Sequence, residues 1–258
     1  MSLLRTDDIA VRFGGVQALS GVSLDAYAGS VTGLIGPNGA GKTTIFNVIS
    51  GLQSPTRGKV YLDGAEITGK GVHQRARLGL ARTFQRLEIF GSLTVRDNVR
   101  VAVEMRRRFA RTRLDVEGVT ADLLERTGIH HLADQRADTL STGQARLTEL
   151  ARALATAPRL LLLDEPGSGL DSAESDAFGN LLVDLAGEGL GILMVEHDME
   201  LVMKVCTWIH VLDFGVKIAE GTPEHIRADE RVQAAYLGAD EDAVPRDDLQ
   251  GAVAGTEQ

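Results

Sequence analysis

The sequence of 258 residues is poor in cysteine and aromatic residues, and it contains no long apolar run. A single cysteine, Cys206, excludes an intrachain disulfide and suits a reducing compartment. Aromatic residues make up 4% of the chain, so a large surface for stacking single-stranded bases is not expected. No segment approaches the ~20 apolar residues of a membrane span. Residues 1–13 lack the pattern of a signal peptide, so we expect none.

Positive charge is also scarce, because 27 basic residues face 36 acidic ones and the net charge is −9. An acidic chain binds nucleic-acid phosphates poorly, so we expect no nucleic-acid partner. The imbalance is strongest in residues 239–258, where six acids accompany one arginine and no apolar periodicity occurs. We predict a disordered tail after Leu237-Gly238 and leave open a functional role for its acidity.

Three short apolar runs alternate with helical patterns. Each run predicts a strand that is buried on both faces, and the runs are residues 31–35, 160–163 and 192–195. A helix is predicted over residues 43–51, ending at a glycine. Another is predicted around residues 178–185, where apolar residues recur at i, i+3, i+4 and i+7. Strands alternating with helices predict an α/β fold with a mostly parallel sheet.

Other segments have different patterns. Residues 3–13, 22–26 and 59–63 alternate polar and apolar positions, which predicts an antiparallel β layer on one flank. The pattern of residues 94–157 predicts helix throughout, and these residues form a candidate subdomain. The chain length fits one large domain with such a subdomain. The predicted divisions are a core (1–86 and 158–238), a helical subdomain (87–157) and the tail (239–258).

The segment between the first apolar run and its helix matches G-x-x-x-x-G-K-[ST]. Its glycines let backbone N–H groups turn toward phosphate oxygens, and the helix N-terminus adds positive potential. Lys42 would bridge the β- and γ-phosphates, and the Thr43 hydroxyl would bind Mg²⁺. A chance glycine-rich turn is the alternative, which the strand–helix context disfavours. The predicted phosphate-binding residues are Gly36, Pro37, Asn38, Gly39, Ala40, Gly41, Lys42, Thr43 and Thr44.

A second motif ends the apolar run at residues 160–163 with Asp164-Glu165. Carboxylates at the C-terminal end of a buried strand lie where α/β sheets bind ligands. Asp164 is predicted to hold Mg²⁺ through water, and Glu165 to polarise an attacking water. Two solvated acids at a strand end are the alternative. Together with the phosphate loop, the motif predicts a nucleoside triphosphatase.

A third motif, Leu140-Ser-Thr-Gly-Gln144, precedes an amphipathic helix. A small polar loop at a helix N-terminus is a second anion site, which a chain with one nucleotide does not need. Such a loop makes sense if it serves a nucleotide held by a partner. The alternative is an ordinary N-cap by Ser141 or Thr142.

Over residues 1 to about 238 the chain resembles an ABC transporter ATPase. The resemblance rests on five strings that occur in this order: LIGPNGAGKTT, LSTGQ, LLLLDEP, GLD and EHD. The chain is most similar to the ATPase subunits of branched-chain amino-acid uptake systems, on Arg12-Phe-Gly-Gly15, Arg82-Thr-Phe-Gln85 and Tyr236-Leu-Gly238. The resemblance implies a P-loop NTPase fold and transport-coupled hydrolysis of ATP with Mg²⁺. Its implied partners are a second ATPase subunit, identical or different, transmembrane permease subunits and, indirectly, an extracytoplasmic substrate-binding protein. The permease would hold the chain on the inner face of the cell membrane.

The resemblance also assigns roles within the chain's own site. Phe13 would stack on adenine, with a core phenylalanine as the alternative. Gln85 would contact Mg²⁺ and the attacking water and sense the membrane subunit, with a solvated glutamine as the alternative. His197 would reach the γ-phosphate, with a structural histidine as the alternative. Mg²⁺ would thus be held by Thr43, Gln85 and Asp164.

Other assigned roles act across a dimer. Ser141, Gly143 and Gln144 belong to the signature loop that would contact the partner's nucleotide. Asp171 would couple the two sites and also fits the N-cap of the following helix. Thr142 departs from the glycine common in the family and stiffens the loop.

Further features are less specific. Residues 167–169, Gly-Ser-Gly, make the loop before Asp171 rich in glycine. The arginines of residues 106–113 would face lipid headgroups, an acidic partner or solvent. His130-His131 lacks a companion at metal-ligand spacing, so no transition-metal site is predicted.

Two rival functions remain. A soluble ABC protein that acts on ribosomes or chromosomes is disfavoured, because the chain carries one cassette and residues 94–139 lack sustained heptads. The ATPase of another transport system, such as lipopolysaccharide export, is opposed weakly by Arg82-Thr-Phe-Gln85.

Overall fold

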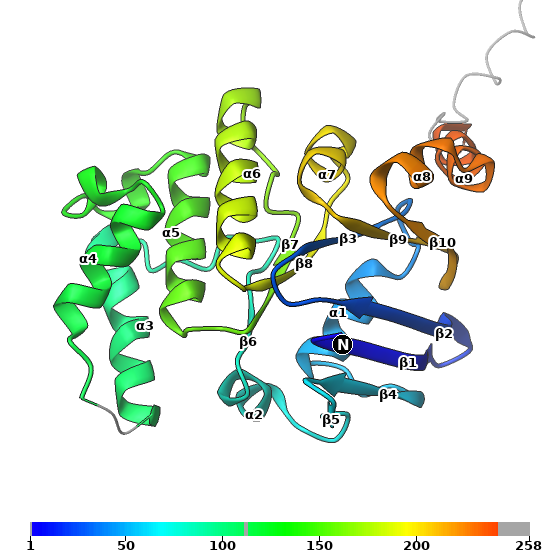
Figure 1. Ribbon diagram of the computed structural model, residues 1–258, viewed down its shortest axis with the longest axis horizontal. Coiled ribbons are helices and arrows are strands. Elements are labelled where there is room, and N and C mark those ends of the chain that lie inside the picture. Colours follow the sequence, from blue (N-terminus) through cyan, green and yellow to red (C-terminus); the bar gives the residue numbers. More distant parts are fainter. Residues whose placement is uncertain (1, 111–112, 242–258) are drawn as a thin grey trace, which may run out of the picture.

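The computed structural model describes residues 2–110 and 113–241 and contains two β-sheets (Figure 1). The larger sheet consists of β3 (Val31–Ile35), β6 (Leu80–Arg82), β7 (Leu160–Asp164), β8 (Gly191–Val195), β9 (Trp208–Asp213) and β10 (Val216–Gly221). Their spatial order is β10-β9-β3-β8-β7-β6. All neighbouring strands are parallel except β10, which pairs antiparallel with β9. The predicted mostly parallel sheet is confirmed.

The smaller sheet is antiparallel and consists of β1 (Leu4–Phe13), β2 (Val16–Ala26), β4 (Arg57–Leu62) and β5 (Ala65–Glu66). Its order is β2-β1-β4-β5. The predicted antiparallel layer is confirmed, although β2 begins at Val16 and not at residue 22. The difference arises because β1 and β2 form one long hairpin, in which Phe13 pairs with Val16.

Two hydrophobic cores lie on the two faces of the larger sheet. Helix α1 (Lys42–Ser50) lies between the sheets (Figure 1), and its Phe46 packs in one core with Leu160 and Leu162 of β7. The intervening residues Leu161 and Leu163 belong to the other core. Because successive side chains of a strand point to opposite faces, an uninterrupted apolar run serves both cores.

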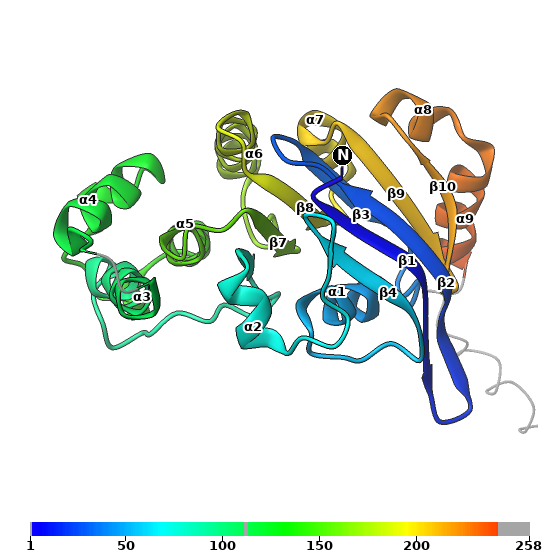
Figure 2. The same ribbon diagram turned by 60° about the horizontal axis from the view of Figure 1, so that its bottom comes forward.

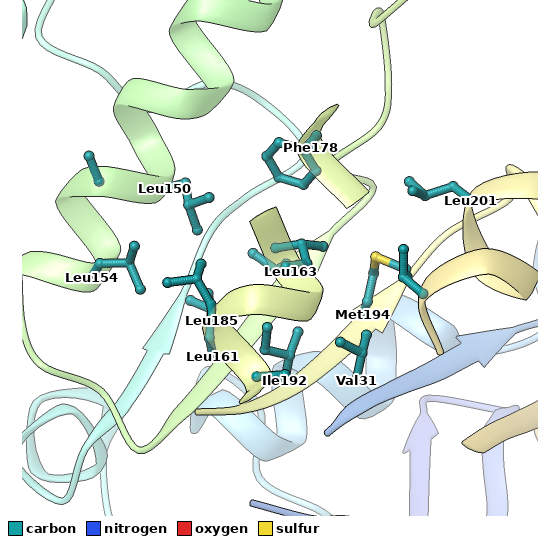
Figure 3. Close-up of a cluster of buried hydrophobic side chains, with 14 of the residues drawn as sticks. Val31, Leu150, Leu154, Leu161, Leu163, Phe178, Leu185, Ile192, Met194 and Leu201 are labelled. Carbon is teal, nitrogen blue, oxygen red and sulfur yellow. The ribbon is translucent and has the colours of Figure 1, made fainter. Parts of the chain in front are cut away.

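The second core is covered by α5 (Thr142–Ala155), α6 (Ser172–Gly187) and α7 (Met199–Val205). Figure 3 shows Leu150 and Leu154 of α5 approaching Leu161 of β7 and Leu185 of α6. The same core extends into α3 (Val95–Ala110) and α4 (Val116–Arg126). The helices predicted within residues 94–157 are therefore present, and they share a continuous core with the sheet.

Helices α3, α4 and α5 lie together at one end of the molecule in Figures 1 and 2. Helices α8 (Pro223–Ala228) and α9 (Glu230–Glu241) lie at the opposite end. The remaining elements are α2 (Val72–Arg77), η1 (His130–Leu132) and η2 (Ala137–Thr139).

The last described helix reaches into the segment that was predicted to be the tail. Helix α9 runs to Glu241, so it includes residues 239–241, whereas residues 242–258 lie outside the described chain. Arg111, one member of the predicted basic run, also lies outside it. Within residues 2–110 and 113–241, no helix combines the length and the apolarity that crossing a bilayer requires.

Candidate active site

The loop from β3 to α1 presents backbone donors. Gly36, Gly39 and Gly41 have φ of 149°, 81° and 102°, a region that favours glycine. A Cβ at Gly36 would lie 2.1 Å from the Leu212 carbonyl oxygen, so only glycine fits there. Gly41 caps α1 without a side-chain hydrogen bond, and the first turn of α1 contains no acid. The N–H groups of that turn therefore suit an anion.

The ammonium of Lys42 lies within this loop. Its Nζ donates to the carbonyl oxygens of Gly36 at 2.6 Å and Pro37 at 3.0 Å. Burial lowers the pKa of Lys42, while the charges of Glu165 and Asp164 oppose the shift. The structure thus brings both carboxylates near the predicted phosphate-binding lysine. Phosphate oxygens can replace the two carbonyls as acceptors.

Asp164 ends β7 beside α1. Its Oδ2 accepts a 2.8 Å hydrogen bond from Arg82 Nη2, while Arg82 Nη1 donates to Asn47 Oδ1 at 2.8 Å. Asn47 lies one helical turn after Thr43, so both occupy one face of α1. Arg82 therefore joins Asp164 to the side of α1 that carries Thr43. Hydroxyl and carboxylate oxygens are the donor types that Mg²⁺ prefers.

Glu165 adopts a backbone conformation that is rare for a residue with a side chain. Its φ is 49°, which costs roughly 1–3 kcal/mol and is common at active sites. Its N–H donates to the Val195 carbonyl oxygen at 2.9 Å, which fixes it against β8. Its Oε2 accepts a 2.7 Å hydrogen bond from Gln85 Nε2. The structure therefore joins two residues predicted to orient the attacking water.

The loop after β8 carries His197, whose side chain is largely exposed. Its N–H donates to Oε2 of Glu196, and Oε1 of Glu196 accepts the N–H of Gly167 at 2.6 Å. Glu196 is buried, and burial raises the pKa of its carboxyl. A Cβ at Gly167 would lie 2.9 Å from Glu196 Oε1. Glycine at position 167 therefore allows Glu196 to join the histidine loop to the loop after Glu165.

Phe13 ends β1 and is half exposed, so the alternative of a core phenylalanine is wrong. Its aromatic face remains a prediction for adenine stacking. Asp171 is the N-cap of α6, and its Oδ1 accepts the N–H of Glu174 at 2.8 Å. The capping role predicted for Asp171 is confirmed.

The signature loop lies apart from the phosphate loop. Ser141 caps α5, its hydroxyl accepting the Gln144 N–H at 3.3 Å while Gln144 Oε1 accepts the Ser141 N–H at 3.1 Å. Gly143 is buried against Glu174, whose Oε1 would lie 2.6 Å from an added Cβ. Figures 1 and 2 place α5 away from α1. The structure does not bring Ser141 to the chain's own phosphate loop.

Comparisons with known proteins match this arrangement. Residues 19–168 match the family model described as ABC transporter, and residues 216–242 match one described as branched-chain amino acid ATP-binding cassette transporter. The chain belongs to the ABC transporter family. It is 39% identical over 249 residues to the high-affinity branched-chain amino acid transport ATP-binding protein BraF of Pseudomonas aeruginosa, covering 92% of this chain and 98% of that one. It is 36% identical over 238 residues to the lipopolysaccharide export system ATP-binding protein LptB of Haemophilus influenzae, with the same two coverages.

Two solved structures extend the comparison. One is an ATP-binding cassette of an ABC transporter in its ADP conformation, with a TM-score of 0.82 and 32% identity over 92% of this chain and 99% of that one. The other is a dimeric cassette bound to ADP and phosphate, with a TM-score of 0.76 and 25% identity over 85% and 98%. The predicted fold and ATPase activity are confirmed, and the chain is an ABC ATPase that binds nucleotide.

Helix α5 of this ABC ATPase, which begins at the signature loop, holds the loop that carries Gln85. Arg146 donates from Nη1 to the Phe84 carbonyl oxygen at 3.1 Å and from Nη2 to that of Gln85 at 2.8 Å. Glu149 Oε1 accepts the N–H of Glu88 at 3.2 Å, and Arg152 donates to the Glu88 carbonyl oxygen. Three residues spaced along one face of α5 therefore bind a single loop.

The contacts of these three residues and of Arg82 were not predicted from the sequence. Arg146, Glu149 and Arg152 recur at i, i+3 and i+6, and the first two are buried. They lie on the face of α5 opposite its apolar residues, so the sequence pattern predicts a solvated face there and gives no sign of burial. Arg82 ends the short strand Leu80-Ala-Arg, and its partner Asp164 is 82 positions away, so it gave no local signal either.

A groove of about 340 Å³ lies beside this loop, between α2, α3 and α5. Phe84, Leu52 and Met105 line it and are exposed, and Phe90, next to it, lies under the Arg152 guanidinium, 4.6 Å from the ring centre. The ABC ATPase therefore presents a partly apolar groove next to Gln85.

Proposed function

We propose that this ABC ATPase powers an importer of branched-chain or related amino acids and works as half of a pair of ATPase subunits. One observation carries the pairing: the signature loop at Ser141 lies on α5, apart from the phosphate loop at α1 (Figure 2). Each chain then supplies a phosphate loop for one nucleotide and a signature loop for the other. The dimeric relative bound to ADP and phosphate supports this arrangement.

The chain's own residues have distinct roles in this proposal. The N–H groups after Gly41 and the Lys42 ammonium bind the β- and γ-phosphates. Thr43, Asp164 and the side-chain oxygen Oε1 of Gln85 would hold Mg²⁺, which would neutralise charge that develops on the phosphates.

Neighbouring residues contact the attacking water, the γ-phosphate and the adenine. Glu165, oriented by its hydrogen bond from Gln85, accepts a proton from the attacking water. His197 lies in the exposed loop after β8, from which an imidazole donor can approach the γ-phosphate. Phe13 offers an exposed ring for adenine.

The groove beside Gln85 is the proposed contact with the permease. Its exposed apolar side chains suit a helix of the membrane subunits, and the Gln85 loop lies between the groove and Glu165. The ATPase would then sit at the cytoplasmic face of the membrane through this contact. A permease helix in the groove would shift the Gln85 loop, and the hydrogen bond from Gln85 would transmit this shift to Glu165.

The substrate class rests on the match of residues 216–242 and the likeness to BraF. The test reconstitutes the chain in proteoliposomes with its own permease subunits, its ATPase partner and its binding protein. We expect ATP-driven uptake of labelled leucine that Glu165→Gln abolishes. Release of lipopolysaccharide to an acceptor, without leucine uptake, would replace the proposal with export, the function named for LptB.

A further inference from the structure

Arg82 is buried between the phosphate-loop helix and the carboxylate that ends β7. Its side chain is 6% exposed and that of Asp164 8%. Besides its bonds to Asp164 and Asn47, Arg82 Nη1 donates to the Ser50 hydroxyl at 3.0 Å. Its guanidinium lies 5.5 Å from the ring centre of Phe46 and 4.9 Å from that of Phe84. The guanidinium is thus fixed from several directions.

This contact occupies one of the two oxygens of Asp164. Arg82 Nη2 donates to Oδ2, and among residues 2–110 and 113–241 the carboxylate accepts no other hydrogen bond. Oδ1 is therefore the oxygen left for another cationic partner. A carboxylate held in this way can offer a metal, or a metal-bound water, one oxygen but not two.

Arg75 provides a natural comparison within the same layer. It is also buried and also touches α1, where Nη1 donates to the carbonyl oxygens of Val48 and Ile49. Its other bonds go to the carbonyl oxygens of Lys70 and Thr68. Arg75 therefore supports the C-terminal end of α1 and, within the described part of the chain, donates to no carboxylate. Only Arg82, of these two arginines, places its charge on Asp164.

We propose that Arg82 is a positioning residue that holds Asp164 in a one-oxygen arrangement and weakens its attraction for the divalent cation. The inference rests on the proposed Mg²⁺ site. A fixed positive charge beside a metal site opposes binding of a second cation, and a buried pair is weakly screened. The residue would thereby hold Asp164 in orientation while preventing the cation from binding too tightly for release.

The test measures metal binding directly by Mn²⁺ electron paramagnetic resonance, on ATP-loaded protein that carries Glu165→Gln to prevent turnover. Into this parent we introduce Arg82→Gln, Arg82→Met, Arg82→Lys and the control Arg75→Gln. ATP binding in EDTA, measured with a fluorescent analogue, checks that the phosphate loop is intact. Methionine fills the space between Phe46 and Phe84 if the glutamine variant does not fold.

We expect Arg82→Gln and Arg82→Met to bind Mn²⁺ about tenfold more tightly than the parent, because a nearby positive charge is lost. Arg82→Lys keeps the charge and should stay within about twofold, as should Arg75→Gln. ATP affinity in EDTA should not change. Unchanged or weaker Mn²⁺ binding in the neutral variants overturns the inference. A parent that takes up no Mn²⁺ with ATP overturns the proposed metal site itself.

Discussion

Gln85 donates its side-chain N–H to Glu165 across 2.7 Å, although the two residues are 80 positions apart in the sequence. Gln85 belongs to the loop held by α5, and Glu165 directly follows β7. The bond therefore ties the groove-side loop to the carboxylate that polarises water. The bond also uses the side-chain nitrogen Nε2 of Gln85, which leaves the side-chain oxygen Oε1 for a cation.

Replacement of Glu165 by glutamine tests the catalytic base. The amide removes the proton acceptor but leaves the phosphate contacts, so we expect the ATPase rate to fall at least ~10²-fold while ATP affinity changes little. Lys42→Ala should instead weaken ATP binding itself, because it removes a phosphate donor. Phosphate release and a nucleotide titration measure both effects. A Glu165→Gln variant with near-normal turnover would refute the assignment.

Replacement of Arg146 by methionine tests whether α5 positions the Gln85 loop. The change removes two hydrogen bonds to the loop and leaves Glu149 without its buried partner. We expect at least a ~10-fold loss in kcat, an ATP KM within about twofold, and a lower melting temperature. The matched control is Arg136→Met, because Arg136 pairs with Asp138 at the surface and such pairs contribute little. If kcat is unchanged while stability falls, Arg146 has a structural role alone.

Cys206 should be inert in the folded protein. It is buried, and burial raises the pKa of its thiol to about 12. Because the thiolate reacts, 5,5′-dithiobis(2-nitrobenzoic acid) at pH 8 should label native protein at least ~10²-fold more slowly than protein in guanidinium. The raised pKa contributes stability below the unfolded value of about 8.5, and this contribution is lost as pH rises toward 12. Equal labelling rates in both states would show an accessible thiol.

Two truncations locate the end of the packed chain. Tyr236 packs against the core that contains Val232, and burial raises the pKa of its phenol to about 12. A chain ending at Gly238 keeps this residue and should melt within about 2 °C of the full protein, because the acidic segment is predicted to bury no core. A chain ending at Ala235 loses it and should melt several degrees lower. Equal melting of both truncations would contradict this packing.

The strands and helices that are marked by apolar runs or by capping residues were predicted well. Residues 160–163 and 192–195 are apolar without interruption because both faces of β7 and β8 are buried. Ser141 and Asp171 cap helices as their residue types favour. By contrast, β9 was not predicted, because its apolar run is interrupted by His210, which is buried and hydrogen-bonded to the backbone of Asp25. Such a partner, 185 residues away, leaves no local signal.

The phosphate loop, Asp164 and Glu165 were likewise found from local motifs, but the contacts that orient them were not. Arg82 reaches Asp164 across 82 positions, and Arg146 reaches Gln85 across 61. Periodicity and spacing describe neighbours along a helix or strand. They carry no information on which distant loop a buried arginine will bind.

The shared site gives the last prediction, which separates a paired ABC ATPase from a self-contained enzyme. Ser141 caps α5, a helix that lies apart from α1 in Figure 2, so its nucleotide is expected to belong to another subunit. The chain should be monomeric or weakly dimeric without ATP. With ATP and Glu165→Gln it should shift toward a dimer, because the nucleotide then binds both chains in the closed state. Light scattering after size-exclusion chromatography measures the shift.

Adding Ser141→Arg to Glu165→Gln should abolish that dimer, because the larger side chain blocks the approach of a partner's γ-phosphate. ATP affinity of the monomer should survive, since the phosphate loop, Asp164 and Thr43 are untouched. Ser175→Arg is the control, because it adds the same side chain one turn into α6 and leaves the cap of α5 unchanged. A heterodimeric system would need the partner ATPase in the same assay. Loss of monomer ATP affinity in Ser141→Arg would show that the signature loop serves its own nucleotide.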